Sequence, residues 1–137
     1  SVGTAYLQIL KFDYNALLIG AISGMLSTSL LIVNNLRDVK SDALSNKNTL
    51  VVIFGENFGR LELLFTLIMP YVVLFLLSKS INVSAVFYNV LPLSIFACSL
   101  FSCSILNKKF LVYKMLPYLS LYIVVFTALL GYSIYDI

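Results

Sequence analysis

Two aspartates four residues apart, Asp38 and Asp42, are the strongest candidates for chemistry in this sequence. If the helix that precedes them continues, Asn34, Asp38 and Asp42 lie on one face, each about 6 Å further along the axis. Proteins typically bind Mg²⁺ through one or two carboxylates together with substrate phosphates. Arg37 and Lys47 would supply positive charge for the same phosphate oxygens. The spacing therefore suits a magnesium-bound diphosphate.

The same residues have a simpler interpretation. A loop rich in Arg, Lys and Asp between two apolar segments often serves only to orient a membrane protein. The chain contains no His, which excludes a His-based metal site or a His general base. Its other acidic residues are isolated from one another: Asp13, Glu56, Glu62 and Asp136.

The composition indicates which elements must hold these residues. The chain is 61% hydrophobic and 11% charged, whereas a soluble domain is about 45–50% apolar and about 25% charged. Four apolar segments have lengths near the roughly 20 residues that cross a bilayer as a helix: about 14–35, 61–77, 83–106 and 115–135. We therefore expect an all-α, polytopic transmembrane helical bundle with four spans, forming a single domain over residues 1–137.

The distribution of basic residues predicts the orientation. Seven of the nine Lys and Arg lie in the segments 36–60 and 107–114, and only Lys11 and Lys79 lie on the other side. Loops rich in Lys and Arg face the cytoplasm, so we expect the charged loop 36–60 on the cytoplasmic side of the cell's inner membrane. This topology explains the net charge of +3, and we expect a lipid bilayer, not a nucleic acid, as partner.

The stretch "NNLRDVKSDALSNKNTLVVIFG", residues 34–55, resembles the second Asp-rich motif of the UbiA superfamily of membrane aromatic prenyltransferases. It is most similar to the branch that acts on 1,4-dihydroxy-2-naphthoate, in which N-N-x-R-D-x-x-x-D is followed by G-K-x-T-L and a Gly. The upstream "VGTAYLQ" also resembles that branch. The resemblance implies that Asp38 and Asp42 are catalytic residues that hold Mg²⁺ and the diphosphate. It also implies diphosphate-binding roles for four residues, Asn34, Asn35, Arg37 and Lys47.

Two positions depart from this pattern. Asn46 replaces the Gly that usually precedes the Lys, but Asn tolerates a left-handed backbone better than most residues, so we expect the turn to survive. Ala43 replaces the basic residue that usually follows the second Asp, which predicts slightly weaker contacts with the diphosphate.

The resemblance also implies the wider context. Members of the superfamily have about nine spans and two Asp-rich motifs, one in each half. The four expected spans would then be the C-terminal part of a nine-helix fold, and the partner missing from this chain is an N-terminal half with the first Asp-rich motif. The implied reaction is transfer of a polyprenyl group from polyprenyl diphosphate to 1,4-dihydroxy-2-naphthoate, with loss of carboxylate, giving demethylmenaquinone.

Two other functions stay open at this point. One is another UbiA-type aromatic prenyltransferase, acting on a hydroxybenzoate, haem or chlorophyll precursor. The other is a non-catalytic membrane transport or assembly protein. Charges inside the apolar segments would favour a transport path, whereas here they concentrate in one segment at the end of the first predicted span.

Overall fold

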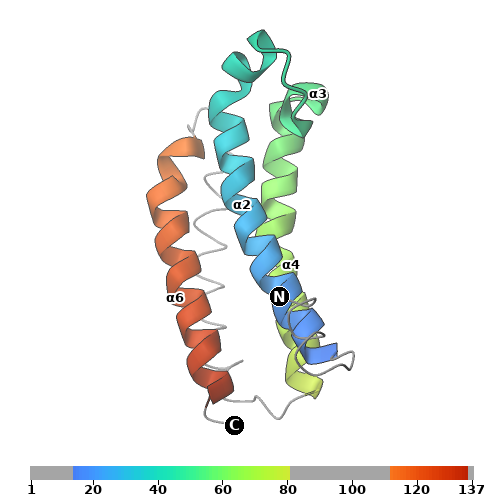
Figure 1. The fold of residues 1–137 in the computed structure, drawn as a ribbon, viewed down its shortest axis with the longest axis vertical. Helices are drawn as coiled ribbons and strands as arrows, with labels where there is room; N and C mark the ends of the chain where they lie inside the picture. Colours follow the sequence, from blue (N-terminus) through green and yellow to red (C-terminus); the bar gives the residue numbers. More distant parts are fainter. Residues whose placement is uncertain (1–13, 81–111, 136–137) are drawn as a thin grey trace.

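The computed structural model describes residues 14–80 and 112–135, and all regular structure in these ranges is helical (Figure 1). The elements are α2 (Tyr14–Leu44), α3 (Leu50–Phe54), α4 (Glu56–Ser80), the 3₁₀ helix η1 (Val112–Met115) and α6 (Leu116–Tyr135). The all-α fold expected from the composition is therefore confirmed for the described part of the chain.

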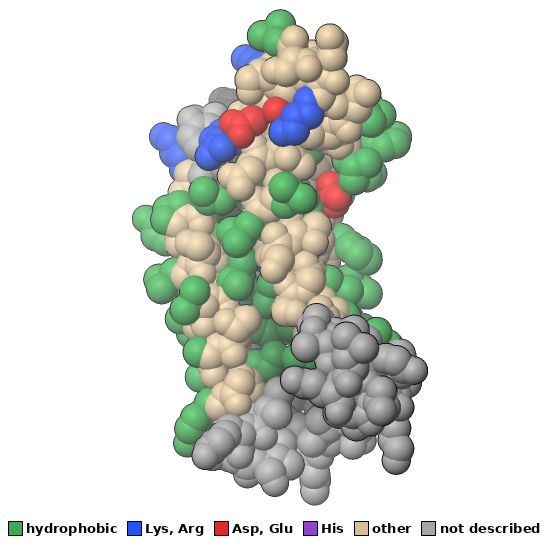
Figure 2. All heavy atoms as spheres, in the orientation of Figure 1, with side chains coloured by type: hydrophobic (Ala, Val, Ile, Leu, Met, Phe, Trp, Pro, Cys, Tyr) green, Lys and Arg blue, Asp and Glu red, His purple; other side chains and the backbone are tan. Residues whose placement is uncertain are grey.

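The long helices α2, α4 and α6 lie side by side, with their axes in roughly the same direction (Figure 1). α2 packs along α4, α3 contacts both of these helices, and α6 packs on α2. The end of α2, all of α3 and the beginnings of α4 and α6 lie at the same end of the bundle (Figure 1). The charged residues of the segment 34–50 are on this end, where Figure 2 shows red and blue side chains gathered.

Residues at helical spacing form the core. Leu18, Ile22 and Leu26 lie on one face of α2 and are buried, as expected for positions four residues apart. They pack in one cluster with residues of α4 and α6, including Leu63, Leu67, Leu119, Tyr122, Phe126 and Leu130. The outward faces are apolar as well, with Leu31, Phe65 and Val124 each more than half exposed. A bundle that is apolar both inside and outside is typical of a helical membrane protein.

Two of the described helices, Tyr14–Leu44 and Glu56–Leu77 within α4, are long and apolar enough to cross a membrane. They include the first and second predicted spans. α6 covers the fourth, and its apolar part, Leu116–Tyr132, is shorter. The third predicted span, 83–106, lies outside the described residues. The count of four spans stays a prediction.

The segment 36–60 was expected to be a loop and is largely helical. Its first residues continue α2 as far as Leu44, its middle forms α3, and its last residues begin α4. Residues 14–35 of α2 contain no charged side chain, and the charges begin at Arg37. Asp38 and Asp42 are therefore held on a helix that extends past its apolar part.

Candidate functional site

The end of α2 is a Schellman turn. The backbone N–H of Lys47 donates to the carbonyl of Asp42 (2.9 Å), and the N–H of Asn46 donates to the carbonyl of Ala43 (3.3 Å). This pair of hydrogen bonds requires a left-handed residue at the position of Asn46, whose φ is 55°. The expectation that Asn can replace Gly in this turn is confirmed.

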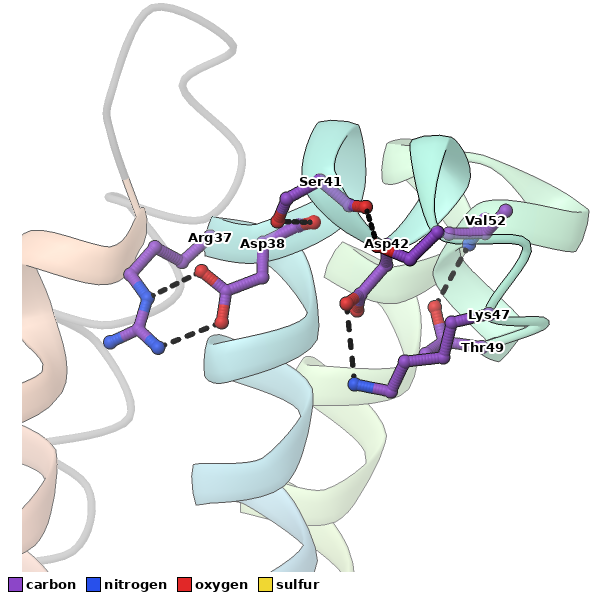
Figure 3. A network of polar contacts seen from close by, with 8 residues as sticks. Arg37, Asp38, Ser41, Asp42, Lys47, Thr49 and Val52 are labelled. Carbon is purple, nitrogen blue, oxygen red and sulfur yellow. Dashed lines mark hydrogen bonds and ion pairs between the residues drawn. The ribbon is translucent and has the colours of Figure 1, made fainter.

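This turn brings the side chain of Lys47 back onto Asp42. Lys47 Nζ lies 3.2 Å from Asp42 Oδ1 (Figure 3). The two residues are five apart, a spacing that does not bring side chains together on a continuous helix. In a Schellman turn, however, these two positions are neighbours and usually form an apolar contact. Here an ion pair replaces that contact.

Asp42 is the more enclosed of the two aspartates, with 8% of its surface exposed. Its second oxygen, Oδ2, is buried and has no hydrogen-bond partner among the described residues. A buried carboxylate oxygen without a donor is costly unless a cation or another donor meets it. Oxygen of this kind is the ligand that Mg²⁺ prefers, so Asp42 fits the predicted role of metal ligand.

Asp38 lies in a different environment. The guanidinium of Arg37 donates two hydrogen bonds of 2.8 Å to the carboxylate of Asp38, from Nε to Oδ1 and from Nη2 to Oδ2 (Figure 3). The hydrogen bond from Arg37 is the main cause that lowers the pKa of Asp38. Both side chains are more than a third exposed, so the carboxylate stays ionised and accessible from outside the bundle.

The structure thus arranges four predicted site residues as two separate ion pairs. Each aspartate has its own basic partner, Arg37 for Asp38 and Lys47 for Asp42. No group of three or more His, Cys, Asp or Glu that could hold a metal occurs among the described residues. Two carboxylates are enough for Mg²⁺ only when phosphate oxygens and water complete its six ligands. A metal held by these two carboxylates would therefore need a bound diphosphate to complete its ligands.

The two asparagines lie about one helical turn before Asp38. Asn34 lines a cavity of about 350 Å³ between α2 and α6, together with Leu30, Leu116, Pro117 and Ser120. The walls are mostly apolar, and the cavity lies one turn of α2 from Asp38. Asn35 is partly buried on α2 and is not among the residues that line this cavity.

Two residues that were not among the predicted site residues hold the site in place. Thr49 caps α3, because its Oγ1 accepts a hydrogen bond from the N–H of Val52 (3.3 Å). Gly59 lets α4 approach its neighbours, since a Cβ there would lie 2.8 Å from Val51 Cγ2 and 3.0 Å from Leu36 Cδ2. The Thr directly before the apolar run 50–54 is a recognisable N-cap signal. Nothing in the sequence alone distinguishes Gly59 from the other glycines.

Part of this chain is similar in sequence to known prenyltransferases. The chain is 42% identical over 59 residues to the 1,4-dihydroxy-2-naphthoate octaprenyltransferase of Mycobacterium leprae. It is 45% identical over 58 residues to the Haemophilus influenzae enzyme of the same name, and 44% identical over 55 residues to that of Escherichia coli. Over these residues the chain is a homologue of prenyltransferases.

The matched residues make up 40–43% of this chain but only 18–20% of each of these three prenyltransferases, so the chain is less than half as long as they are. No protein-family model and no solved structure matches it. The resemblance to the naphthoate branch, which the motif predicted, is confirmed over that part of the chain.

Proposed function

We propose that this chain forms part of a membrane prenyltransferase that transfers a polyprenyl group from polyprenyl diphosphate to 1,4-dihydroxy-2-naphthoate. The observation that carries the proposal is the paired arrangement of Asp38 and Asp42 on one helix end, in a chain homologous to enzymes of that name. In this proposal the charged segment 36–60 faces the cytoplasm, and a second Asp-rich motif lies outside these 137 residues.

Each residue of the site has a proposed role in binding the diphosphate. Asp38 and Asp42 hold Mg²⁺, which when bound neutralises charge on the diphosphate as it leaves. Arg37 and Lys47 lie beside these carboxylates and supply further positive charge to the departing oxygens. Asn34 supports the same end of the substrate from the wall of the cavity between α2 and α6.

The proposed reaction conserves atoms and charge. The allylic C–O bond breaks and its electron pair leaves with the diphosphate. An electron-rich ring carbon of the naphthoate then forms a C–C bond with the allylic carbon, and the carboxylate of the acceptor leaves as CO₂. The prenyl tail lies among apolar helices, whose outward side chains include Leu31 and Phe65.

The acceptor can be tested directly. The full-length membrane protein is incubated with a polyprenyl diphosphate, Mg²⁺, and either 1,4-dihydroxy-2-naphthoate or 4-hydroxybenzoate, and the products are identified by mass spectrometry. We expect a prenylated, decarboxylated naphthalenediol and no prenylated benzoate. A prenylated benzoate alone would assign the protein to the other UbiA-type reaction. No product with either acceptor, from protein that is folded and inserted, would favour a non-catalytic function.

A further inference from the structure

The two members of the Lys47–Asp42 pair differ greatly in how firmly they are held. The side chain of Asp42 is 11% exposed, whereas the side chain of Lys47 is 62% exposed. The Schellman turn fixes the backbone of Lys47 through its N–H bond to the Asp42 carbonyl, but the exposed four-carbon stem can rotate in solvent. A lysine ammonium is a compact charge on a flexible stem. Lys47 can therefore leave Asp42 while the backbone stays in place.

The Asp42 carboxylate, by contrast, is costly to leave without a positive partner, because it is largely buried. Removing one partner of a buried ion pair leaves an uncompensated charge, which is strongly unfavourable. Asp42 Oδ1 accepts a hydrogen bond from the ammonium of Lys47 at 3.2 Å. Asp42 Oδ2 has no hydrogen-bond donor among the described residues.

We propose that Lys47 is the resident counter-ion of Asp42, that a divalent cation must displace it, and that the released ammonium then turns to the diphosphate. This inference rests on the proposed function. A divalent ion on the Asp42 carboxylate would lie within a few ångströms of the ammonium, and like charges at that distance repel strongly. Lys47 and the metal therefore exclude each other at Asp42. A diphosphate that arrives with the metal offers Lys47 new oxygens, so binding of the two is coupled.

Lys40 provides a matched control. It lies on the same end of α2, two residues before Asp42, and is exposed. Its charge contributes to the same local potential, but no ion pair within the described residues joins it to Asp42. Substitution of Lys40 thus measures how the loss of a nearby positive charge changes metal affinity in general. It leaves the ion pair between Lys47 and Asp42 in place.

The test measures metal affinity without turnover. Full-length protein in lipid nanodiscs is titrated with Mn²⁺, a spectroscopic substitute for Mg²⁺, and free Mn²⁺ is followed by electron paramagnetic resonance. Without pyrophosphate, Lys47→Met should bind Mn²⁺ roughly tenfold more tightly than the unchanged protein, and Lys40→Met should differ by no more than about twofold. Lys47→Arg, which keeps the charge, should show no gain. With inorganic pyrophosphate present, Lys47→Met should bind the Mn²⁺–pyrophosphate pair more weakly than the unchanged protein.

Two outcomes separate this inference from the function on which it rests. If Asp42→Asn abolishes Mn²⁺ binding while Lys47→Met binds no more tightly than Lys40→Met, the exchange is wrong and the metal site stands. If Asp42→Asn binds Mn²⁺ as well as the unchanged protein, the metal site itself is wrong, and the exchange with it.

Thermal unfolding covers the case in which Lys47→Met folds poorly. In EDTA this variant should unfold at a lower temperature than Lys40→Met, and Mn²⁺ should restore more of its stability, because the metal then compensates the bare carboxylate. Equal restoration by Mn²⁺ in the two variants would overturn the exchange.

Discussion

Gly59 of α4 faces Val51 of α3 so closely that a Cβ at position 59 would lie 2.8 Å from Cγ2 of Val51. The same Cβ would lie 3.0 Å from Cδ2 of Leu36 on α2. Gly59 thus lets α2, α3 and α4 pack closely together at Leu36, which lies two residues before Asp38 on α2.

Substitution of Gly59 by Ala should therefore destabilise the protein. Val51 is β-branched and stiff, so the new methyl group forces a backbone shift that costs about 1–3 kcal/mol. Gly24→Ala is the matched control, because a Cβ there meets nothing within 4 Å and Ala favours a helix by about 1 kcal/mol over Gly. Thermal unfolding in one detergent compares the two variants. Equal unfolding temperatures would show that the contact at Gly59 is unimportant.

The left-handed turn at Asn46 gives a second prediction. Asn46→Val should strain the turn by roughly 1–2 kcal/mol, because a β-branched residue avoids a φ of 55°. The strain should move Lys47 away from the position from which its ammonium reaches the diphosphate, and so raise the KM for polyprenyl diphosphate. Asn46→Gly, which accepts this conformation easily, should keep the original KM. A valine variant with an unchanged KM would show that the turn does not position Lys47.

The hydroxyl groups of Tyr71 and Tyr122 form a hydrogen bond between α4 and α6. Tyr122→Phe removes the partner of the Tyr71 hydroxyl inside the bundle and should lower the free energy of unfolding by about 1 kcal/mol. The double variant Tyr71→Phe/Tyr122→Phe should recover part of this loss, since the Tyr71 hydroxyl is then no longer left without the partner that it has in the unchanged protein. A double-mutant cycle measures the coupling, and strictly additive single effects would contradict it.

Much of this fold could be predicted from local pattern. Leu18, Ile22 and Leu26 recur at helical spacing and are buried as that spacing predicts, and the uncharged, mostly apolar stretch before Arg37 indicates a membrane helix. The length of α2 was harder to predict, because a helix that continues nine residues past residue 35 into charged sequence has no hydrophobic signal to follow. Thr49 gives an N-cap signal for a helix that begins at residue 50, but a helix of only five residues is too short for an apolar repeat to predict.

The candidate site was predicted by residue type more successfully than by arrangement. Asp38 and Asp42 were expected to act together, but whether each would have its own cation depends on the side-chain direction of Arg37 and on the turn at Asn46. The contact between Lys47 and Asp42 depends on a reversal of the backbone at the end of α2, which a helical spacing rule does not predict. Close approach at Gly59 depends on how α4 packs against Val51 of α3 and Leu36 of α2, which the local sequence around Gly59 does not indicate.

The role of Asp42 is the central claim of this account, and turnover by the full-length protein tests it most directly. Prenyl transfer to 1,4-dihydroxy-2-naphthoate is measured at saturating Mg²⁺ for the unchanged protein, for Asp42→Asn, and for Glu56→Gln as a control on an exposed acidic residue of α4. We predict that Asp42→Asn lowers turnover by about a hundredfold or more, while Glu56→Gln stays near normal. Turnover by folded Asp42→Asn equal to that of the unchanged protein would contradict a metal-binding role for Asp42.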